Sequence, residues 1–85
     1  MAEQTILIAE VDPDIRDGVR ILLSGEGYHI IEAENGTRAL EVFRPEVDLV
    51  ILDIMMPGMS GLRVCEELRK LSTVPILFLT AKSQE

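Results

Sequence analysis

The sequence lacks the features that mark secreted and membrane proteins. Its single cysteine excludes an internal disulfide. No apolar run approaches the ~18 residues that a membrane-spanning helix needs, and the chain does not open on a basic segment followed by an apolar stretch. We therefore expect a cytoplasmic protein without membrane contact.

Basic and aromatic residues are also scarce. Eight lysines and arginines stand against 15 acidic residues, and the formal net charge is −7. Because affinity for nucleic acids depends on clustered basic side chains, we expect no direct nucleic-acid contact by this chain. Tryptophan is absent, and only two Phe and one Tyr accompany a hydrophobic fraction of 47%. An aliphatic core of the kind found in α/β sheets is therefore expected.

Short apolar runs alternate with amphipathic segments along the chain. The apolar runs are residues 5–9, 28–33, 47–53 and 76–79, and the helical patterns are residues 13–24, 37–43 and 61–71. Such alternation predicts a single α/β domain, residues 1–85, with a parallel sheet and right-handed crossovers. The doubly wound, flavodoxin-like arrangement places the first strand beside the third, so the expected strand order is 2-1-3-4.

The expected helices have recognisable starts and apolar faces. Asp12 followed by Pro13 is typical of an N-cap and a first helical residue. Periodicity predicts one apolar face per helix, and Cys65 is interpreted as a small buried hydrophobe. The single histidine, His29, is expected at a surface or edge position. The predicted faces are Ile15, Val19, Leu22 and Leu23 in the first helix, and Leu62, Cys65 and Leu68 in the third.

One carboxylate, Asp53, directly follows the buried run of the third strand. Ligands of an open parallel sheet bind outside the carboxyl ends of its strands, so Asp53 is expected to face a site. The alternative is an Asp that only ends a strand and begins a turn, which is a common use of Asp. Pro57, Gly58 and Gly61 predict a shaped loop that leads into the next helix.

Acidic residues are concentrated near the first and third strands. The two groups are Glu10, Asp12, Asp14 and Asp17, and Glu46, Asp48 and Asp53. Because these strands are expected to be neighbours, we expect the groups to converge, with the Thr80 hydroxyl within reach. Such oxygens fit a Mg²⁺ site, although a solvated acidic surface explains each acid singly. With a cation present, Asp53 could attack a phosphoryl group and form an aspartyl phosphate.

Four stretches make the sequence recognisable: TILIAEVDPDIRDGV, GYHIIEAENGTRALE, DLVILDIMMPGMSGL and PILFLTAK. They resemble the receiver domain of two-component response regulators over all 85 residues, and most closely the subfamily whose receivers precede a winged-helix DNA-binding domain. The resemblance implies a signalling switch in transcription regulation rather than an enzyme. It implies that Asp53 is the phosphoacceptor and that a sensor histidine kinase is the phosphoryl donor.

The resemblance also implies a ligand set. In the family, Mg²⁺ is bound by the phosphoacceptor, here Asp53, by the backbone carbonyl two residues later, here Met55, and by an acidic pair after the first strand. That pair aligns with Glu10 and Val11, and valine cannot bind a metal. Asp12 is the alternative second acid, although its use as a helix cap points it elsewhere. We therefore expect weak Mg²⁺ binding and slow phosphorylation. The family's switch hydroxyl corresponds to Thr80.

The chain ends after the fourth strand, so the resemblance implies a truncated receiver domain without the family's fifth strand and the lysine that follows it. An unpaired apolar edge at residues 76–79 predicts a homo-oligomer. A second hypothesis follows, in which a receiver-like fragment is not phosphorylated and acts through protein association. A third, a phosphatase with an aspartate nucleophile, is disfavoured because Met55 stands where such enzymes usually carry a second acid.

Overall fold

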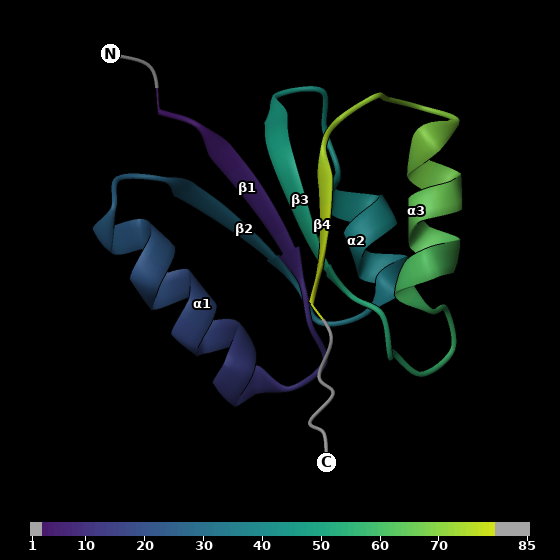
Figure 1. Ribbon diagram of the computed structural model, residues 1–85, viewed down its shortest axis with the longest axis horizontal. Coiled ribbons are helices and arrows are strands. Elements are labelled where there is room, and N and C mark those ends of the chain that lie inside the picture. Colours follow the sequence, from purple (N-terminus) through teal and green to yellow (C-terminus); the bar gives the residue numbers. More distant parts are fainter. Residues whose placement is uncertain (1–2, 80–85) are drawn as a thin grey trace.

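Four parallel strands form one sheet in the computed structural model, which describes residues 3–79. The strand order is β2-β1-β3-β4, so the order expected for a flavodoxin-like fold is confirmed for these four strands (Figure 1). The elements in chain order are β1 (Thr5–Ala9), α1 (Pro13–Gly25), β2 (His29–Ala33), α2 (Gly36–Val42), β3 (Val47–Asp53), α3 (Gly61–Arg69) and β4 (Ile76–Leu79).

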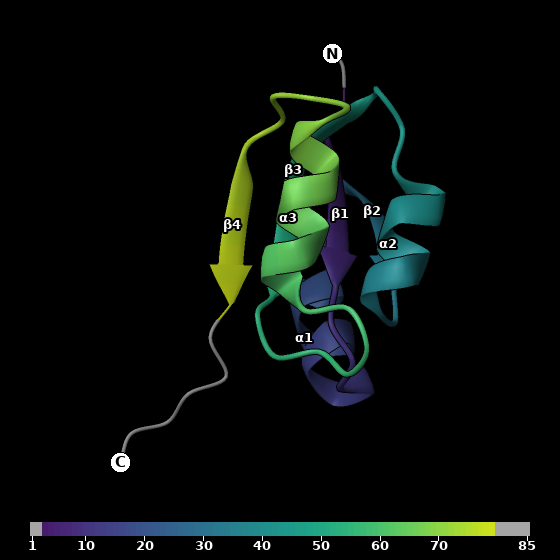
Figure 2. The same ribbon diagram turned by 90° about the vertical axis from the view of Figure 1, so that its right-hand side faces the viewer.

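Helices cover both faces of the sheet. Helices α2 and α3 lie on one face and α1 lies on the other (Figure 2). Alternate residues of the central strands therefore enter two apolar clusters, as the two-residue period of a strand requires. Leu7 and Leu52 belong to the cluster under α2 and α3, whereas Ile8 and Ile51 belong to the cluster on the α1 side.

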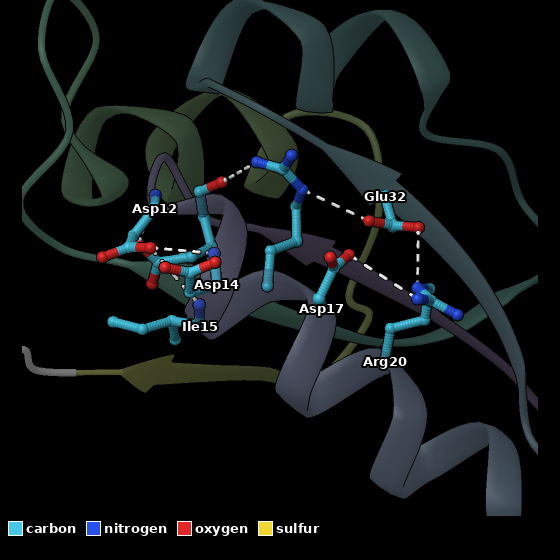
Figure 3. Close-up of polar contacts among 8 residues, drawn as sticks. Asp12, Asp14, Ile15, Asp17, Arg20 and Glu32 are labelled. Atoms are coloured by element: carbon cyan, nitrogen blue, oxygen red, sulfur yellow. Dashed lines mark hydrogen bonds and ion pairs between the residues drawn. The ribbon is translucent and has the colours of Figure 1, made fainter.

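The start of α1 confirms the predicted cap. Asp12 Oδ1 accepts hydrogen bonds from the backbone N–H groups of Asp14 at 2.9 Å and Ile15 at 3.4 Å (Figure 3). Two of the four residues of the predicted apolar face, Val19 and Leu23, pack on the sheet. By contrast Ile15 is exposed, and Leu22 is 72% exposed. The reason is that α1 packs mainly on β1 and β2 and leaves much of the sheet on its side uncovered.

The predicted apolar stripe of α3 is wrong at its first residue. Leu62 is 56% exposed, and the buried side chains are Val64 and Leu68. Each step of three residues falls about 60° short of a full helical turn, so two such steps cannot keep Leu62 and Leu68 on one face. Cys65 lies beside the buried face and is half-buried against the core rather than fully buried.

The outer strands agree with expectation where the structure describes them. His29 is exposed at the first residue of β2, which confirms the predicted edge position. Strand β4 is the other outer strand of the four, and its Leu77 is exposed. Within residues 3–79, none of the helices combines the length and the apolar character needed to cross a bilayer. Thr80 lies outside the described residues.

Candidate functional site

Two carboxylates meet at the carboxyl edge of the sheet. Strands β1 and β3 pair with Ala9 opposite Leu52, so Glu10, which directly follows β1, lies beside Asp53, the last residue of β3. Both are buried: Glu10 is 4% exposed and Asp53 is 3% exposed. The strand order therefore brings together two residues that are 43 positions apart in the chain.

Backbone N–H groups hold both carboxylates in place. The N–H of Asp12 donates to Glu10 Oε2 at 3.0 Å, and the N–H of Met55 donates to Asp53 Oδ1 at 3.0 Å. Within residues 3–79, neither carboxylate forms an ion pair. Buried carboxylates without a cationic partner are costly, and hard oxygen ligands of this kind suit Mg²⁺. The residues present therefore fit a divalent cation.

The environment of Glu10 raises its pKa above the ordinary value of 4.5. Burial is the largest cause, the hydrogen bond from the Asp12 N–H opposes it, and the hydrogen bond and charge of Asp53 add to the rise. Folding thus favours the protonated acid, so the stability of the fold falls as the pH rises above this ordinary value. Perturbed acids of this kind are concentrated at functional sites.

The expected convergence of two acidic groups holds only for Glu10 and Asp53. Glu46 and Asp48 lie at the opposite, amino edge of the sheet, where Asp48 Oδ2 accepts a hydrogen bond from the Thr5 N–H at 2.9 Å. The prediction failed because residues at the start of a strand and residues at its end lie on opposite edges. Among residues 3–79, no three acidic, histidine or cysteine side chains gather closely enough to hold a metal.

The other acids of the first group lie on α1 or at its N-cap. Asp12 is exposed and serves as the N-cap, so its role as a metal ligand stays a prediction. Asp17 pairs with Arg20 at 3.6 Å on the helix surface (Figure 3). This ion pair holds the Asp17 carboxylate on the exposed surface of α1.

The loop after β3 is closed at its base beside Asp53. The N–H of Gly61 donates to the Ile54 carbonyl at 3.0 Å, and the N–H of Ile54 donates to the Leu79 carbonyl at 3.3 Å. Gly58 has a φ of 79°, a left-handed conformation that favours glycine. A Cβ added at Gly61 would lie 2.2 Å from the Asp53 carbonyl oxygen. Glycine at residue 61 therefore permits the close packing that fixes Asp53.

Two site features escaped the sequence interpretation. The sequence predicts Gly61 as the end of the loop and the start of the third helix, but no pattern in it shows which atoms Gly61 approaches. The sequence gives no signal for Arg16, because an arginine on an amphipathic helix is usually solvated. In the structure its Nη1 donates to the Glu10 carbonyl oxygen at 2.7 Å. The predicted Met55 carbonyl ligand stays a prediction, and Met55 contributes its N–H to Asp53.

The chain matches known proteins along nearly its whole length. The model of the response regulator receiver domain matches residues 6–85. The chain is 53% identical over 78 residues to the uncharacterized transcriptional regulatory protein YrkP of Bacillus subtilis, covering 92% of this chain and 34% of that protein. It is 42% identical over 84 residues to the transcriptional regulatory protein ResD of the same species, covering 98% of this chain and 35% of that protein. The chain thus spans about a third of the length of these relatives.

Solved structures agree with this match. The response regulator TrrA of Thermotoga maritima, in complex with Mg²⁺–BeF, gives a TM-score of 0.86 at 48% identity and covers 94% of this chain and 71% of that chain. TrrA in complex with the histidine kinase ThkA gives a TM-score of 0.84 at 47% identity, with 95% and 72% covered. Fold, site and sequence converge on one assignment: this chain belongs to the family of response regulator receiver domains.

Proposed function

We propose that this chain accepts a phosphoryl group on Asp53 from a sensor histidine kinase and so acts as a signalling switch rather than as an enzyme. The buried pair of carboxylates, Glu10 and Asp53, is the observation that carries the proposal. Its relatives support it, because TrrA was solved with Mg²⁺–BeF and with a histidine kinase. Transcription regulation as the output, which the names of YrkP and ResD suggest, and a cytoplasmic location both stay predictions.

The chain's own residues supply positioning and the nucleophile. An oxygen of the Asp53 carboxylate attacks the phosphorus, and the bond from phosphorus to the donor breaks. The Met55 N–H restricts rotation of the Asp53 carboxylate, and Glu10, Asp53 and the Met55 carbonyl would hold a Mg²⁺. A bound Mg²⁺ supplies positive charge that lets the acids and the phosphoryl group approach one another. The Thr80 hydroxyl would donate a hydrogen bond to a phosphoryl oxygen.

Weak Mg²⁺ binding and slow phosphorylation form part of the proposal. Val11 follows Glu10 at the carboxyl end of β1 and is 37% exposed, and its side chain offers no oxygen ligand. A site with fewer carboxylates binds a divalent cation less tightly. Asp12 is committed to the cap of α1, which leaves Glu10 and Asp53 as the buried acids of the site.

Incubation with Mg²⁺ and acetyl phosphate, followed by intact-mass measurement, tests the function. We expect a slow gain of one phosphoryl group in the original chain and none in Asp53→Asn, because the amide is no nucleophile for this reaction. Chelating the Mg²⁺ should also abolish the gain. A phosphoryl group on Asp53→Asn would show that another residue is the acceptor. If neither the original chain nor Val11→Asp gains a phosphoryl group, the proposed function is contradicted.

We infer a second candidate, association between copies of the chain, from exposed apolar surface on the α1 side. Leu77 of β4 is 54% exposed, and a groove of about 280 Å³ lies between α1 and the strands. Apolar surface of this kind is typical of an interface. The groove is lined by Gln4, Ile6, Leu23, Tyr28, Asp48, Leu49, Ile51 and Leu77.

Light scattering at micromolar concentration tests the association. We expect a dimer or larger species, and Leu77→Lys should shift it to monomer because a charge would be buried at the contact. Leu71→Lys is the matched control, since Leu71 is an exposed leucine beyond the end of α3. A monomeric original chain with a cooperative melt would contradict this candidate and leave the phosphoacceptor function intact.

A further inference from the structure

Helix α1 reaches the phosphoacceptor site through one side chain. Arg16 Nη1 donates to the Glu10 carbonyl oxygen at 2.7 Å, and Arg16 Nε lies 3.2 Å from Glu32 Oε1 on β2. The Arg16 side chain is mostly buried, at 17% exposed. A guanidinium can make both contacts at once because its donors form a rigid planar fork. One side chain thus links α1, the end of β1 and β2.

The hydrogen bond from Arg16 gives the last backbone polar group of Glu10 a partner. Its own N–H donates to the Ala33 carbonyl of β2 at 3.1 Å, and its Oε2 accepts from the Asp12 N–H at 3.0 Å. The Glu10 carbonyl is the third polar group of the residue, and Arg16 satisfies it. Without Arg16 this carbonyl would lose its partner in a part-buried position, and the turn from Glu10 to Asp12 would be held by one hydrogen bond fewer.

We propose that Arg16 is a positioning residue of the phosphoacceptor site, which holds the Glu10 peptide so that the Glu10 carboxylate faces Asp53. The inference rests on the proposed function and assigns Arg16 no contact with the phosphoryl group or the metal. Groups outside the direct ligands commonly change metal affinity by about 10-fold to 100-fold when they are removed. Arg16 acts in this way through the backbone of a ligand.

Charge and position predict opposite effects for the loss of Arg16. Removing a positive charge near an acidic site favours cation binding by Coulomb's law, whereas releasing Glu10 weakens it. A lower Mg²⁺ affinity in Arg16→Gln would therefore report positioning. Arg20 provides the matched control, because its Nε also pairs with Glu32, at 3.3 Å, and it lies one helical turn further along α1 (Figure 3). Within residues 3–79, Arg20 forms ion pairs with Asp17 and Glu32 and none with Glu10.

Two measurements test the inference on the full chain. In metal-free protein, hydrogen exchange of the Asp12 amide should be about tenfold faster in Arg16→Gln than in the original chain, and unchanged within twofold in Arg20→Gln. In Mg²⁺ titrations followed by NMR, Arg16→Gln should bind about tenfold more weakly, as expected for an outer group that orients a ligand. Arg20→Gln should stay within twofold.

Arg16→Lys separates positioning from folding. An ammonium can reach the Glu10 carbonyl or Glu32 but not both, so we expect intermediate exchange and affinity. Equal Asp12 exchange in Arg16→Gln and Arg20→Gln would overturn the inference, as would unchanged or tighter Mg²⁺ binding in Arg16→Gln. An original chain that binds no Mg²⁺ would instead contradict the proposed function, and the exchange result would still decide the role of Arg16.

Discussion

Gly61→Ala is expected to lower the free energy of unfolding by about 3 kcal/mol, the upper range for overpacking a tight site. The new Cβ would lie 2.2 Å from the Asp53 carbonyl oxygen, 2.9 Å from its carbon and 3.0 Å from the Ile54 Cα. All three are backbone atoms, which no change of side-chain rotamer can move away. The base of the loop must open, and the Gly61 N–H would lose its 3.0 Å bond to the Ile54 carbonyl. A small domain has only ~5 to 15 kcal/mol of stability, so the loss is large.

Urea denaturation of three variants checks this expectation. Gly61→Ala should lower the midpoint without a change of slope. Gly18→Ala is the matched control, because a Cβ on exposed Gly18 of α1 meets nothing within 4 Å and alanine favours a helix by about 0.5–1 kcal/mol. Gly58→Ala measures the cost of a left-handed backbone without a steric clash, since Gly58 has a φ of 79° and open space around it. A Gly61→Ala midpoint equal to that of the original chain would show that the loop is not closed against Asp53.

Val11→Asp is expected to tighten Mg²⁺ binding by about tenfold and to speed phosphorylation by acetyl phosphate. Near a protein surface, unit charges 4 Å apart interact by about 4 kcal/mol. Repulsion from Glu10 and Asp53 offsets most of that gain, and a remainder of about 1.4 kcal/mol corresponds to tenfold. Val11 is 37% exposed, so replacing it leaves no cavity in the core.

Calorimetric Mg²⁺ titration and intact-mass time courses check the gain. Val11→Asn has nearly the same shape as Val11→Asp without the charge, and it should bind Mg²⁺ much as the original chain does. Equal affinity in all three proteins would show that Val11 does not limit the metal site. The gain should disappear in Val11→Asp combined with Asp53→Asn if both acids bind the same ion.

The raised pKa of Glu10 means that the ionised form of this acid lowers the stability of the metal-free fold. Burial next to Asp53 disfavours the ionised acid, yet the ionised acid is what a Mg²⁺ ligand requires. A bound cation would offset both the burial of the Glu10 charge and its repulsion by Asp53. Glu10 therefore reduces the stability of the metal-free fold while it supplies one of the acids of the proposed metal site.

Much of the fold could be predicted because its cause is local. The apolar run that ends at Asp53 has the bounds predicted for β3, and Asp12 caps α1 through its own neighbours in the chain. Strand order also followed, because alternating strands and helices allow few arrangements. The helix faces were less predictable. Ile15 and Leu22 are apolar, but a helix buries only the residues that face a partner, and α1 packs mainly on β1 and β2.

The sequence alone determined the strands, the cap at Asp12 and the place of Asp53 at the end of β3, because periodicity and capping depend on residues a few positions apart. Only the tertiary structure decided which acids meet. Of the acids expected to converge, it brought Glu10 beside Asp53 and placed Glu46 and Asp48 at the opposite edge, since neighbours across a sheet depend on strand order and direction. It also decided the contacts of Gly61 and Arg16. Those contacts join elements that are distant in the chain, and the spacing of residues along the chain carries no record of them.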